Sequence, residues 1–298
     1  MLASLRQSRF PTAVTDPEVR RFESQGYLAY EGLLNPQEVA EATQALSQVI
    51  QAAHTEALRG DQDIRVEAGD SARSNYAGYS LKSVSGSFLL RFQAGTTPME
   101  MPTAEAELLV RVLYGFCRQH PMFQKVVAHP RIMAVVESLV GSGALLFQDM
   151  AMIKPRRIGS EKPWHQDDAY FSYAPLDQIV GVWIALDDTT VANGCMHVLP
   201  GDHLRGGLKH YNSAVDCEIV PDRLEKDRAV PIELAAGGVL FFSGLLPHQT
   251  PPNTSDRRRR ALQFHYRGAA TQQLDKLSYD AVYQDPDGTP ASCKAAAD

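Results

Sequence analysis

The spacing of hydrophobic residues changes character near residue 144. In the first half of the chain, apolar residues recur at intervals of three and four, which is typical of amphipathic helices. The segment 15–18 (Thr-Asp-Pro-Glu) predicts a helix start, because proline suits the first turn and an acidic residue there favours the helix dipole. A second helix is expected from Pro36 to about His54. Its apolar residues keep helical spacing: Val39, Ala42, Leu46, Val49 and Ile50.

Two further helices are predicted at 103–118 and 121–140. The first rests on Leu108, Leu109, Val112, Leu113 and Phe116, and the second on Phe123, Val126, Val127, Ile132, Val135 and Leu139. Between them and the early helices, residues 59–101 are mixed in pattern and rich in Gly, Ser and Asp. This stretch is too long for a simple connection, so we interpret it as an ordered functional loop or lid.

From Ala144 onward the period falls toward two, which indicates short strands separated by turn residues such as Asn193-Gly194. Helices followed by many short strands predict an α+β protein whose strands close into a sandwich or jelly roll. We expect a single domain over 1–298, with a mainly helical part at 1–143, a β core at 144–269 and a loosely held tail at 270–298. The predicted strands are Leu145–Lys154, Ile179–Leu186, Met196–Leu199, Val230–Leu234, Gly238–Phe242 and Arg260–Tyr266.

Composition narrows the class of protein. Apolar residues make up 44% and charged residues 21% of 298, which is ordinary for a globular chain. The net charge of −6 disfavours a nucleic-acid partner, whose binding depends on neutralising phosphates. The N-terminus has arginines where a signal peptide needs apolar residues, and the strongly apolar piece at 239–246 is far below the ~20 residues that span a bilayer. We therefore expect a soluble, cytoplasmic protein without a membrane partner; the sequence does not indicate its oligomeric state.

The four cysteines share no short spacing, so a zinc ribbon or a thioredoxin-type motif is not indicated. Reduced thiols are the simpler interpretation, with Cys195 and Cys217 buried.

The sharpest chemical signal is the pair His165 and Asp167. Residues two apart in a strand point to one face, roughly 6.6 Å apart along the chain, so both side chains can reach one ion. They supply two of the three ligands of the 2-His-1-carboxylate triad of non-haem iron sites. His248, which ends an apolar strand, is the best candidate for the third. The alternative is a chance triplet whose side chains are satisfied in a loop.

The four arginines at 257–260 follow His248. Strand parity places Arg259, Gln263 and His265 on one face and the apolar residues 262, 264 and 266 on the other. If the apolar face packs against the N-terminal helices, Arg259 points into the barrel, where its planar fork suits a carboxylate. The other three arginines then form a solvated basic turn.

Four segments together carry a family resemblance: WHQD at 164–167, WIALDD at 183–188, NGCMHVLPGDH at 193–203 and HQTPPNTSDRRRR at 248–260. In order and spacing they resemble the phytanoyl-CoA dioxygenase family, and residues 22–34 and 36–46 also resemble its N-terminal helices. The family's enzymes are Fe(II)- and 2-oxoglutarate-dependent oxygenases that use O2. The resemblance implies a double-stranded β-helix, a cupin-like jelly-roll core with N-terminal helices packed on one sheet.

Carried over position by position, the resemblance implies that His165, Asp167 and His248 bind iron. It also places the cofactor residues at Arg259, Thr250, Trp183 and Met150, with open space beside Trp183 at Gly181 and Ala185. The family's further cofactor lysine has no clear counterpart here, and Lys82 and Arg91 are only candidates.

The function implied is hydroxylation of a small organic molecule at an unactivated C–H bond, with release of succinate and CO2. We expect substrate contacts from Tyr79, Asp168 and Tyr170, which lie in stretches rich in aromatic residues, and from Arg156 near the pocket mouth. The tyrosines could equally be ordinary packing residues.

The sequence leaves several alternatives to hydroxylation open. Desaturation, epoxidation or ring formation would use the same residues, whereas a halogenase is disfavoured because Asp167 is present. Acyl-CoA hydroxylation needs a basic patch, and outside 257–260 the sequence has only the short pair Arg156-Arg157. A ligand-binding protein without turnover is disfavoured by the complete triad together with Arg259. A zinc hydrolase or isomerase would have no use for Arg259 or Thr250.

Overall fold

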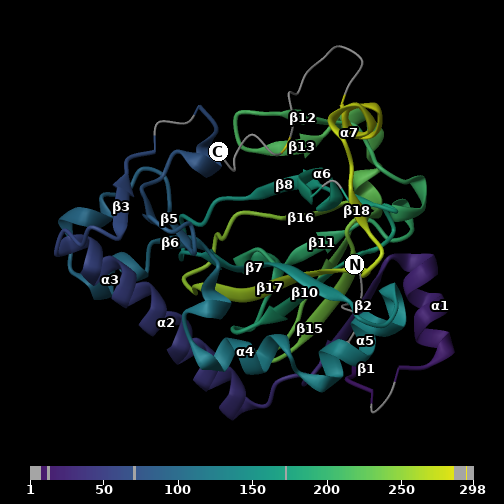
Figure 1. The fold of residues 1–298 in the computed structure, drawn as a ribbon, viewed down its shortest axis with the longest axis horizontal. Helices are drawn as coiled ribbons and strands as arrows, with labels where there is room; N and C mark the ends of the chain where they lie inside the picture. Colours follow the sequence, from purple (N-terminus) through teal and green to yellow (C-terminus); the bar gives the residue numbers. More distant parts are fainter. Residues whose placement is uncertain (1–7, 12–13, 70–71, 172, 285–292, 294–298) are drawn as a thin grey trace.

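The computed structural model describes residues 8–11, 14–69, 72–171, 173–284 and 293 of the chain. Two β-sheets face each other (Figure 1). In spatial order the large sheet contains β1 (Ser8–Arg9), β2 (Tyr27–Glu31), β15 (Val239–Ser243), β10 (Ile179–Ala185), β17 (Arg259–Arg267), β7 (Leu145–Lys154), β6 (Val110–Tyr114), β5 (Leu89–Phe92), β4 (Ser80–Ser83) and β3 (Ile64–Glu67). The small sheet contains β14 (Val230–Ile232), β11 (Met196–Val198), β16 (His248–Thr250) and β8 (Lys162–His165).

The chain crosses between the sheets repeatedly after β7. Strands β7, β10, β15 and β17 join the large sheet, whereas β8, β11, β14 and β16 join the small one. Their pairings within each sheet are antiparallel, and β1 pairs with β2 in parallel, so the large sheet is mixed. Two short ribbons complete the strands: β12 (His210–Asn212) with β13 (Cys217–Ile219), and β18 (Gln272–Gln273) with β9 (Tyr173–Ala174).

The two predicted helix starts near the N-terminus are confirmed. α1 (Asp16–Gln25) and α2 (Pro36–Leu58) each begin with a capping box, in which the side chains of Thr15 and Asn35 pair with a glutamate three residues on. The remaining helices are α3 (Thr103–Glu107), α4 (Pro121–Val127), α5 (Pro130–Val140), α6 (Asp168–Phe171) and α7 (Lys276–Tyr283).

The helices α2, α4 and α5 cover the outer face of the large sheet (Figure 1). Leu262, Phe264 and Tyr266 of β17 belong to the core that this layer forms with the helices. A second, smaller core lies between the sheets and includes Trp183 and Phe242. The predicted parity of β17 is therefore confirmed, with its apolar face toward the helices.

Two predicted helices in the first half are wrong in part. Over 103–118, the helix ends at Glu107 and residues 110–114 form β6 instead. β6 is buried between β5 and β7, so apolar residues occupy both of its faces and imitate helical spacing. The predicted helix at 121–140 is two helices, because Pro130 lacks the N–H needed inside a helix and begins a new one.

The segment 59–101 is not a loop laid over the site. Its strands β3, β4 and β5 extend the large sheet beyond β6 by antiparallel pairing. The alternation of side chains between the two faces of the large sheet therefore continues through this segment.

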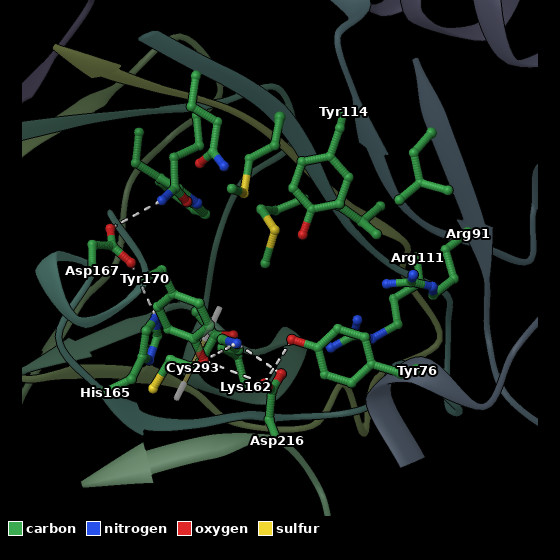
Figure 2. A pocket seen from close by; sticks show the side chains of 18 of the residues that line it. Tyr76, Arg91, Arg111, Tyr114, Lys162, His165, Asp167, Tyr170, Asp216 and Cys293 are labelled. Atoms are coloured by element: carbon green, nitrogen blue, oxygen red, sulfur yellow. Dashed lines mark hydrogen bonds and ion pairs between the residues drawn. The ribbon is translucent and has the colours of Figure 1, made fainter. Parts of the chain in front are cut away.

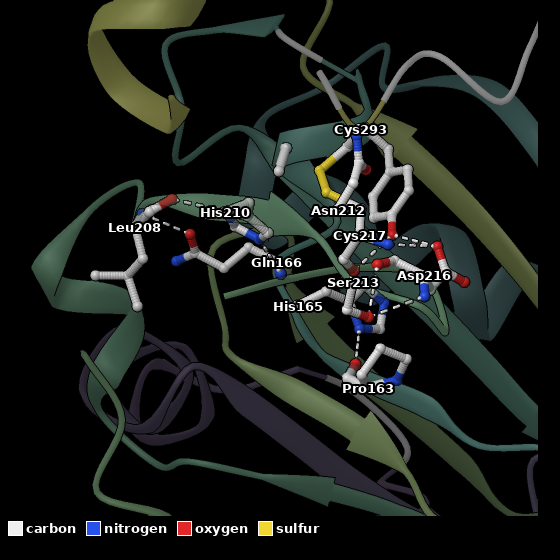
Figure 3. The surroundings of a disulfide bond; sticks show 12 residues. Pro163, His165, Gln166, Leu208, His210, Asn212, Ser213, Asp216, Cys217 and Cys293 are labelled. Atoms are coloured by element: carbon white, nitrogen blue, oxygen red, sulfur yellow. Dashed lines mark hydrogen bonds between the residues drawn. A yellow bond between two sulfur atoms is a disulfide. The ribbon is translucent and has the colours of Figure 1, made fainter. Parts of the chain in front are cut away.

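The prediction of a loosely held tail is wrong for the part of 270–298 that the structure describes. Helix α7 buries Tyr279 and Tyr283, and Cys293 forms a disulfide with Cys217 of β13 (Figure 3). The expected free thiol at Cys217 is therefore also wrong, whereas Cys195 is a buried free thiol, as is Cys117.

Within the described residues, no helix combines the length and apolar character needed to cross a bilayer.

Candidate metal centre and ligand cavity

Three buried side chains converge between the sheets. His165 at the end of β8 and His248 at the start of β16 are register partners across the small sheet. Asp167 lies just beyond β8, in the turn that leads into α6, rather than in the strand as predicted. One nitrogen or oxygen atom from each of the three lies within 4.8 Å of the other two. A single ion can therefore be bound by all three.

Both histidines direct their Nε2 atoms toward the place where the three side chains meet. The Nδ1 atom of His165 donates to the carbonyl of Pro163 at 2.8 Å, and that of His248 to the carbonyl of Leu246 at 2.9 Å. These bonds orient the rings and leave the Nε2 lone pairs for a metal. Burial and the adjacent His165 lower the pKa of His248 to about 3, which keeps its imidazole neutral and able to bind.

The carboxylate of Asp167 divides its two oxygens between two tasks. Oδ1 lies 3.3 Å from His165 Nε2 and 3.7 Å from His248 Nε2, whereas Oδ2 lies 2.7 Å from His265 Nε2. Desolvation alone would raise the pKa of Asp167, but the imidazoles of His248 and His265 and the hydrogen bonds outweigh it and lower the pKa well below its usual range. The site therefore offers two imidazole nitrogens and one anionic carboxylate, a donor set that suits a divalent ion of the iron group.

Arg259 is fully buried at the start of β17, as parity predicts. Its Nη1 donates to the carbonyl of Met152 at 3.0 Å, and its guanidinium carbon lies 5.4 Å from the centre of the Trp183 ring. Among the described residues, neither Arg259 Nε nor the buried hydroxyl of Thr250 has a hydrogen-bond partner. Burial lowers the pKa of Arg259 to about 10, so it is a cation at neutral pH.

Thr250 lines the cavity together with Trp183, whose ring lies against Arg259. Unpartnered buried donors are costly unless something binds them, and a carboxylate can accept from both. The residues present therefore fit a dicarboxylic acid held beside the metal.

The neighbouring arginines are engaged elsewhere. Arg258 pairs with Glu107 at 3.0 Å and Arg260 with Asp187 at 2.6 Å, while the exposed Arg257 lies 3.6 Å from Asp188.

A cavity of about 390 Å³ opens beside the triad. Met150, Trp183 and Thr250 lie on its wall together with all three triad residues. Figure 2 shows His165 and Asp167 on one side of the cavity. The expected free space beside Trp183 at Gly181 is absent, because the ring of Phe242 fills it and lies 2.3 Å from where a Cβ of residue 181 would be.

One of the four predicted substrate residues lines this cavity. Tyr170 lies on its wall. Tyr79 instead packs against the helical core, Asp168 is buried with both carboxylate oxygens unpartnered among the described residues, and Arg156 is exposed in the turn after β7. The structure thus separates Tyr170 from the other three.

Sequence reasoning missed several residues that shape the site. His265 was placed on the inner face but given no role, and Lys162 and Asp216 form a buried ion pair of 2.7 Å on the cavity wall. Asp216 also accepts hydrogen bonds from Asn75, Tyr76 and Tyr170. The alternation of side chains along β17 puts His265 on the same face as Arg259, and this could have indicated that His265 lies at the site. No local pattern indicated Asp216, because its partners come from distant segments.

The disulfide lies close to Asp216, a residue of the cavity wall (Figure 3). Cys293 lines the cavity, and the carbonyl of Cys217 accepts a hydrogen bond from the Tyr170 hydroxyl at 3.1 Å.

A two-histidine, one-carboxylate site between two facing sheets is typical of non-haem iron oxygenases. Comparison with known families is in agreement: the sequence model of the phytanoyl-CoA dioxygenase (PhyH) family matches residues 22–261. The chain belongs to this family.

Relatives match over nearly the whole chain. A phytanoyl-CoA dioxygenase domain-containing protein 1 from Danio rerio is 25% identical over 274 residues, which cover 85% of this chain and 89% of the relative. A phytanoyl-CoA dioxygenase from Arabidopsis thaliana is 25% identical over 263 residues, covering 85% and 88%.

Solved structures share the fold. EvdO2 from Micromonospora carbonacea var. aurantiaca, complexed with 2-oxoglutarate, has a TM-score of 0.60 at 22% identity and covers 89% of this chain and 94% of its own. The carbocyclase SnoK from nogalamycin biosynthesis, described as non-heme and alpha ketoglutarate dependent, has a TM-score of 0.60 at 21% identity, covering 88% of each chain.

Proposed function

We propose that this protein is an Fe(II)- and 2-oxoglutarate-dependent dioxygenase that hydroxylates a small organic molecule at an unactivated C–H bond. The observation that carries the proposal is the buried triad together with two buried donors, Arg259 Nε and the Thr250 hydroxyl, that have no partner among the residues the structure describes. Membership of the PhyH family and the likeness to EvdO2 with 2-oxoglutarate support the same pair of cofactors. The alternation of eight strands between two sheets supports a double-stranded β-helix within one domain.

In this proposal each residue has a defined task. His165, Asp167 and His248 hold the iron, and His265 fixes the orientation of the Asp167 carboxylate. Arg259 binds the distal carboxylate of 2-oxoglutarate, with Thr250 donating a hydrogen bond. Lys154 holds the backbone of Thr250 in place, because its Nζ donates to the Thr250 carbonyl at 3.2 Å.

When bound, iron and 2-oxoglutarate supply the oxidising chemistry, in which O2 is consumed and succinate and CO2 are released. The chain contributes position and a dry environment. Trp183 and Met150 form walls of the cavity, and the Tyr170 ring lies against the His165 ring, with centres 5.8 Å apart. These side chains exclude water from the reacting side of the metal.

The proposal is tested by anaerobic loading with Fe(II) and 2-oxoglutarate, followed by O2 and a broad panel of small molecules. We expect Fe(II)-dependent succinate formation that increases with a substrate and a product heavier by one oxygen atom. A product lighter by two hydrogens would assign desaturation instead. If the protein binds neither Fe(II) nor 2-oxoglutarate, the proposal is overturned in favour of a ligand-binding protein without turnover.

A further inference from the structure

Three cationic side chains gather on the cavity wall away from the triad. Lys82 of β4, Arg91 of β5 and Arg111 of β6 come from adjacent strands of the large sheet and all line the cavity. Figure 2 shows Arg91 and Arg111 on the opposite side of the cavity from Asp167 and His165.

Two of these cations, Lys82 and Arg91, have no anionic partner among the residues that the structure describes. Arg111 donates to the Ser160 hydroxyl at 3.0 Å and to the carbonyl of Asn75 at 3.2 Å. Arg91 stacks on the Tyr76 ring at 5.0 Å, but neither it nor Lys82 forms a hydrogen bond or ion pair with any residue that the structure describes. Both are half-buried, so their charges face the cavity without full hydration.

The carboxylates of the wall form no ion pair with Lys82 or Arg91 among the described residues. Asp167 faces the two histidines, and Asp216 is occupied by Lys162, Asn75 and two tyrosines. Glu67 lies at the exposed rim and forms no ion pair with the described residues. The far end of the cavity is therefore electropositive.

The distance between the two ends follows from the strand order. Gln263 of β17 lies 3.4 Å from Asp167, and β5 is three strands away from β17. Neighbouring strands are ~4.8 Å apart, and Arg91 is two residues out of line with Gln263, so the two backbones lie more than roughly 14 Å apart. Arg91 is therefore remote from the triad, although the sequence made it a candidate for the cofactor cation. Val112, Met150 and Met152 line the wall between them and make it largely apolar.

We infer that the substrate carries an anionic group, a carboxylate or a phosphate, at the end remote from its reacting carbon, and that Arg91 and Lys82 bind this group. The inference rests on the proposed function and specifies the substrate class of the same site. An apolar body would lie on Val112, Met150 and Met152, with the reacting carbon toward the triad. The absence of a basic patch in the linear sequence does not argue against such a substrate, because sheet pairing assembles one.

Binding by apo-protein tests the inference without turnover. Titration calorimetry would compare carboxylic acids of increasing length, both straight-chain and phenyl-substituted, each against its primary amide, and phenyl phosphate against phenol. Because charged hydrogen bonds are stronger than neutral ones, we expect at least one acid or phosphate to bind on the order of 10- to 100-fold more tightly than its neutral analogue. Comparing the Kd of the tightest-binding carboxylate with that of phenyl phosphate shows which of the two anions the site prefers.

Variants locate the site of the preference. Arg91→Gln should abolish it and Lys82→Gln should reduce it, whereas Arg91→Lys should retain part of it. Arg65→Gln is the matched control, because Arg65 is exposed on β3, is paired with Lys82 in register and does not line the cavity. Arg259→Gln should keep the preference, because Arg259 belongs to the 2-oxoglutarate end.

The inference is overturned if no acid or phosphate is preferred over its neutral analogue. It is also overturned if the preference disappears in Arg259→Gln and survives in Arg91→Gln. Fe(II)-dependent consumption of 2-oxoglutarate is measured separately on the same protein. If an Arg91-dependent preference is present without such consumption, the anion site stands and the proposed oxygenase function fails.

Discussion

The Nε2 atom of His265 lies 2.7 Å from Oδ2 of Asp167, so one oxygen of this carboxylate is occupied and the other faces the two histidines. Both residues are buried, and Gln263 Nε2 lies 3.1 Å from the same imidazole nitrogen. A hydrogen bond of this kind fixes the carboxylate in one orientation before any metal binds.

Replacing His265 should weaken metal binding without removing a ligand. We expect His265→Leu to lower the affinity for Fe(II) by roughly 10- to 100-fold, the usual effect of losing a residue that orients a ligand. Anaerobic titration calorimetry measures this. His197→Gln is the control, because His197 is half-buried on β11 outside the cavity wall. Equal Fe(II) affinity in His265→Leu and the wild type would contradict this role.

Arg259 should dominate the binding of 2-oxoglutarate. Losing one partner of a buried charged pair costs roughly 2–5 kcal/mol, so Arg259→Ala should raise the Kd for 2-oxoglutarate at least ~30-fold. Arg257→Ala should leave the Kd unchanged, because Arg257 is exposed and faces Asp188. A larger loss in Arg257→Ala than in Arg259→Ala would show that a different arginine holds the cofactor.

The ion pair between Glu107 and Arg258 should stabilise the fold rather than the site. Desolvation raises the pKa of Glu107, but hydrogen bonds from Gln51, Ser47 and Arg258 outweigh it and lower the pKa below its usual range. An acid with a lowered pKa adds stability above its unfolded pKa and loses it as the pH falls through its folded pKa. Glu107→Gln should therefore reduce the free energy of unfolding at pH 7 by about 1–3 kcal/mol.

The difference between Glu107→Gln and the wild type should shrink as the pH falls below about 4, where the wild-type carboxylate becomes protonated. Urea unfolding at several pH values measures this. A difference that is constant between pH 7 and pH 3 would show that charge plays no part.

Replacing Tyr170 should affect the reaction, whereas replacing Tyr79 should affect the stability of the fold. Tyr170 lines the cavity, and its hydroxyl accepts from Lys162 at 2.8 Å, so Tyr170→Ala should admit water and increase the succinate formed per product. Tyr79→Ala should lower stability through lost packing with the helical core, with coupling unchanged. The ratio of succinate to product, measured for both variants and the wild type, tests this prediction. A wild-type ratio in Tyr170→Ala would place the substrate elsewhere.

The sequence predicted best the features that depend on local periodicity. The strand Leu145–Lys154 has the predicted bounds, and the inward side of Arg259 follows from alternation along β17. His165 and Asp167 could be paired from the sequence because they lie two residues apart, and the structure brings both together with His248.

Features that depend on pairing between distant segments were not predictable in this way. The strand Val110–Tyr114 carries apolar residues on both faces because it is central in the sheet, and local spacing therefore favoured a helix. Lys82, Arg91 and Arg111 are isolated charges in the sequence, and only the register of β4, β5 and β6 brings them to one cavity. The Cys217–Cys293 bond joins cysteines with no recognisable spacing.

The pairing of β2 with β15 has a consequence for how the chain folds during synthesis. Tyr30 lies opposite Val239, so β2 lacks this neighbour until most of the chain has left the ribosome. Contacts between residues so far apart in sequence slow folding, because a long loop must close before the pairing stabilises anything. Leu28 and Tyr30 are apolar and are buried once the sheet forms. Before residue 239 is made they lack the cover of β15, so we expect nascent chains stopped before this residue to bind chaperones and to aggregate more than the complete chain.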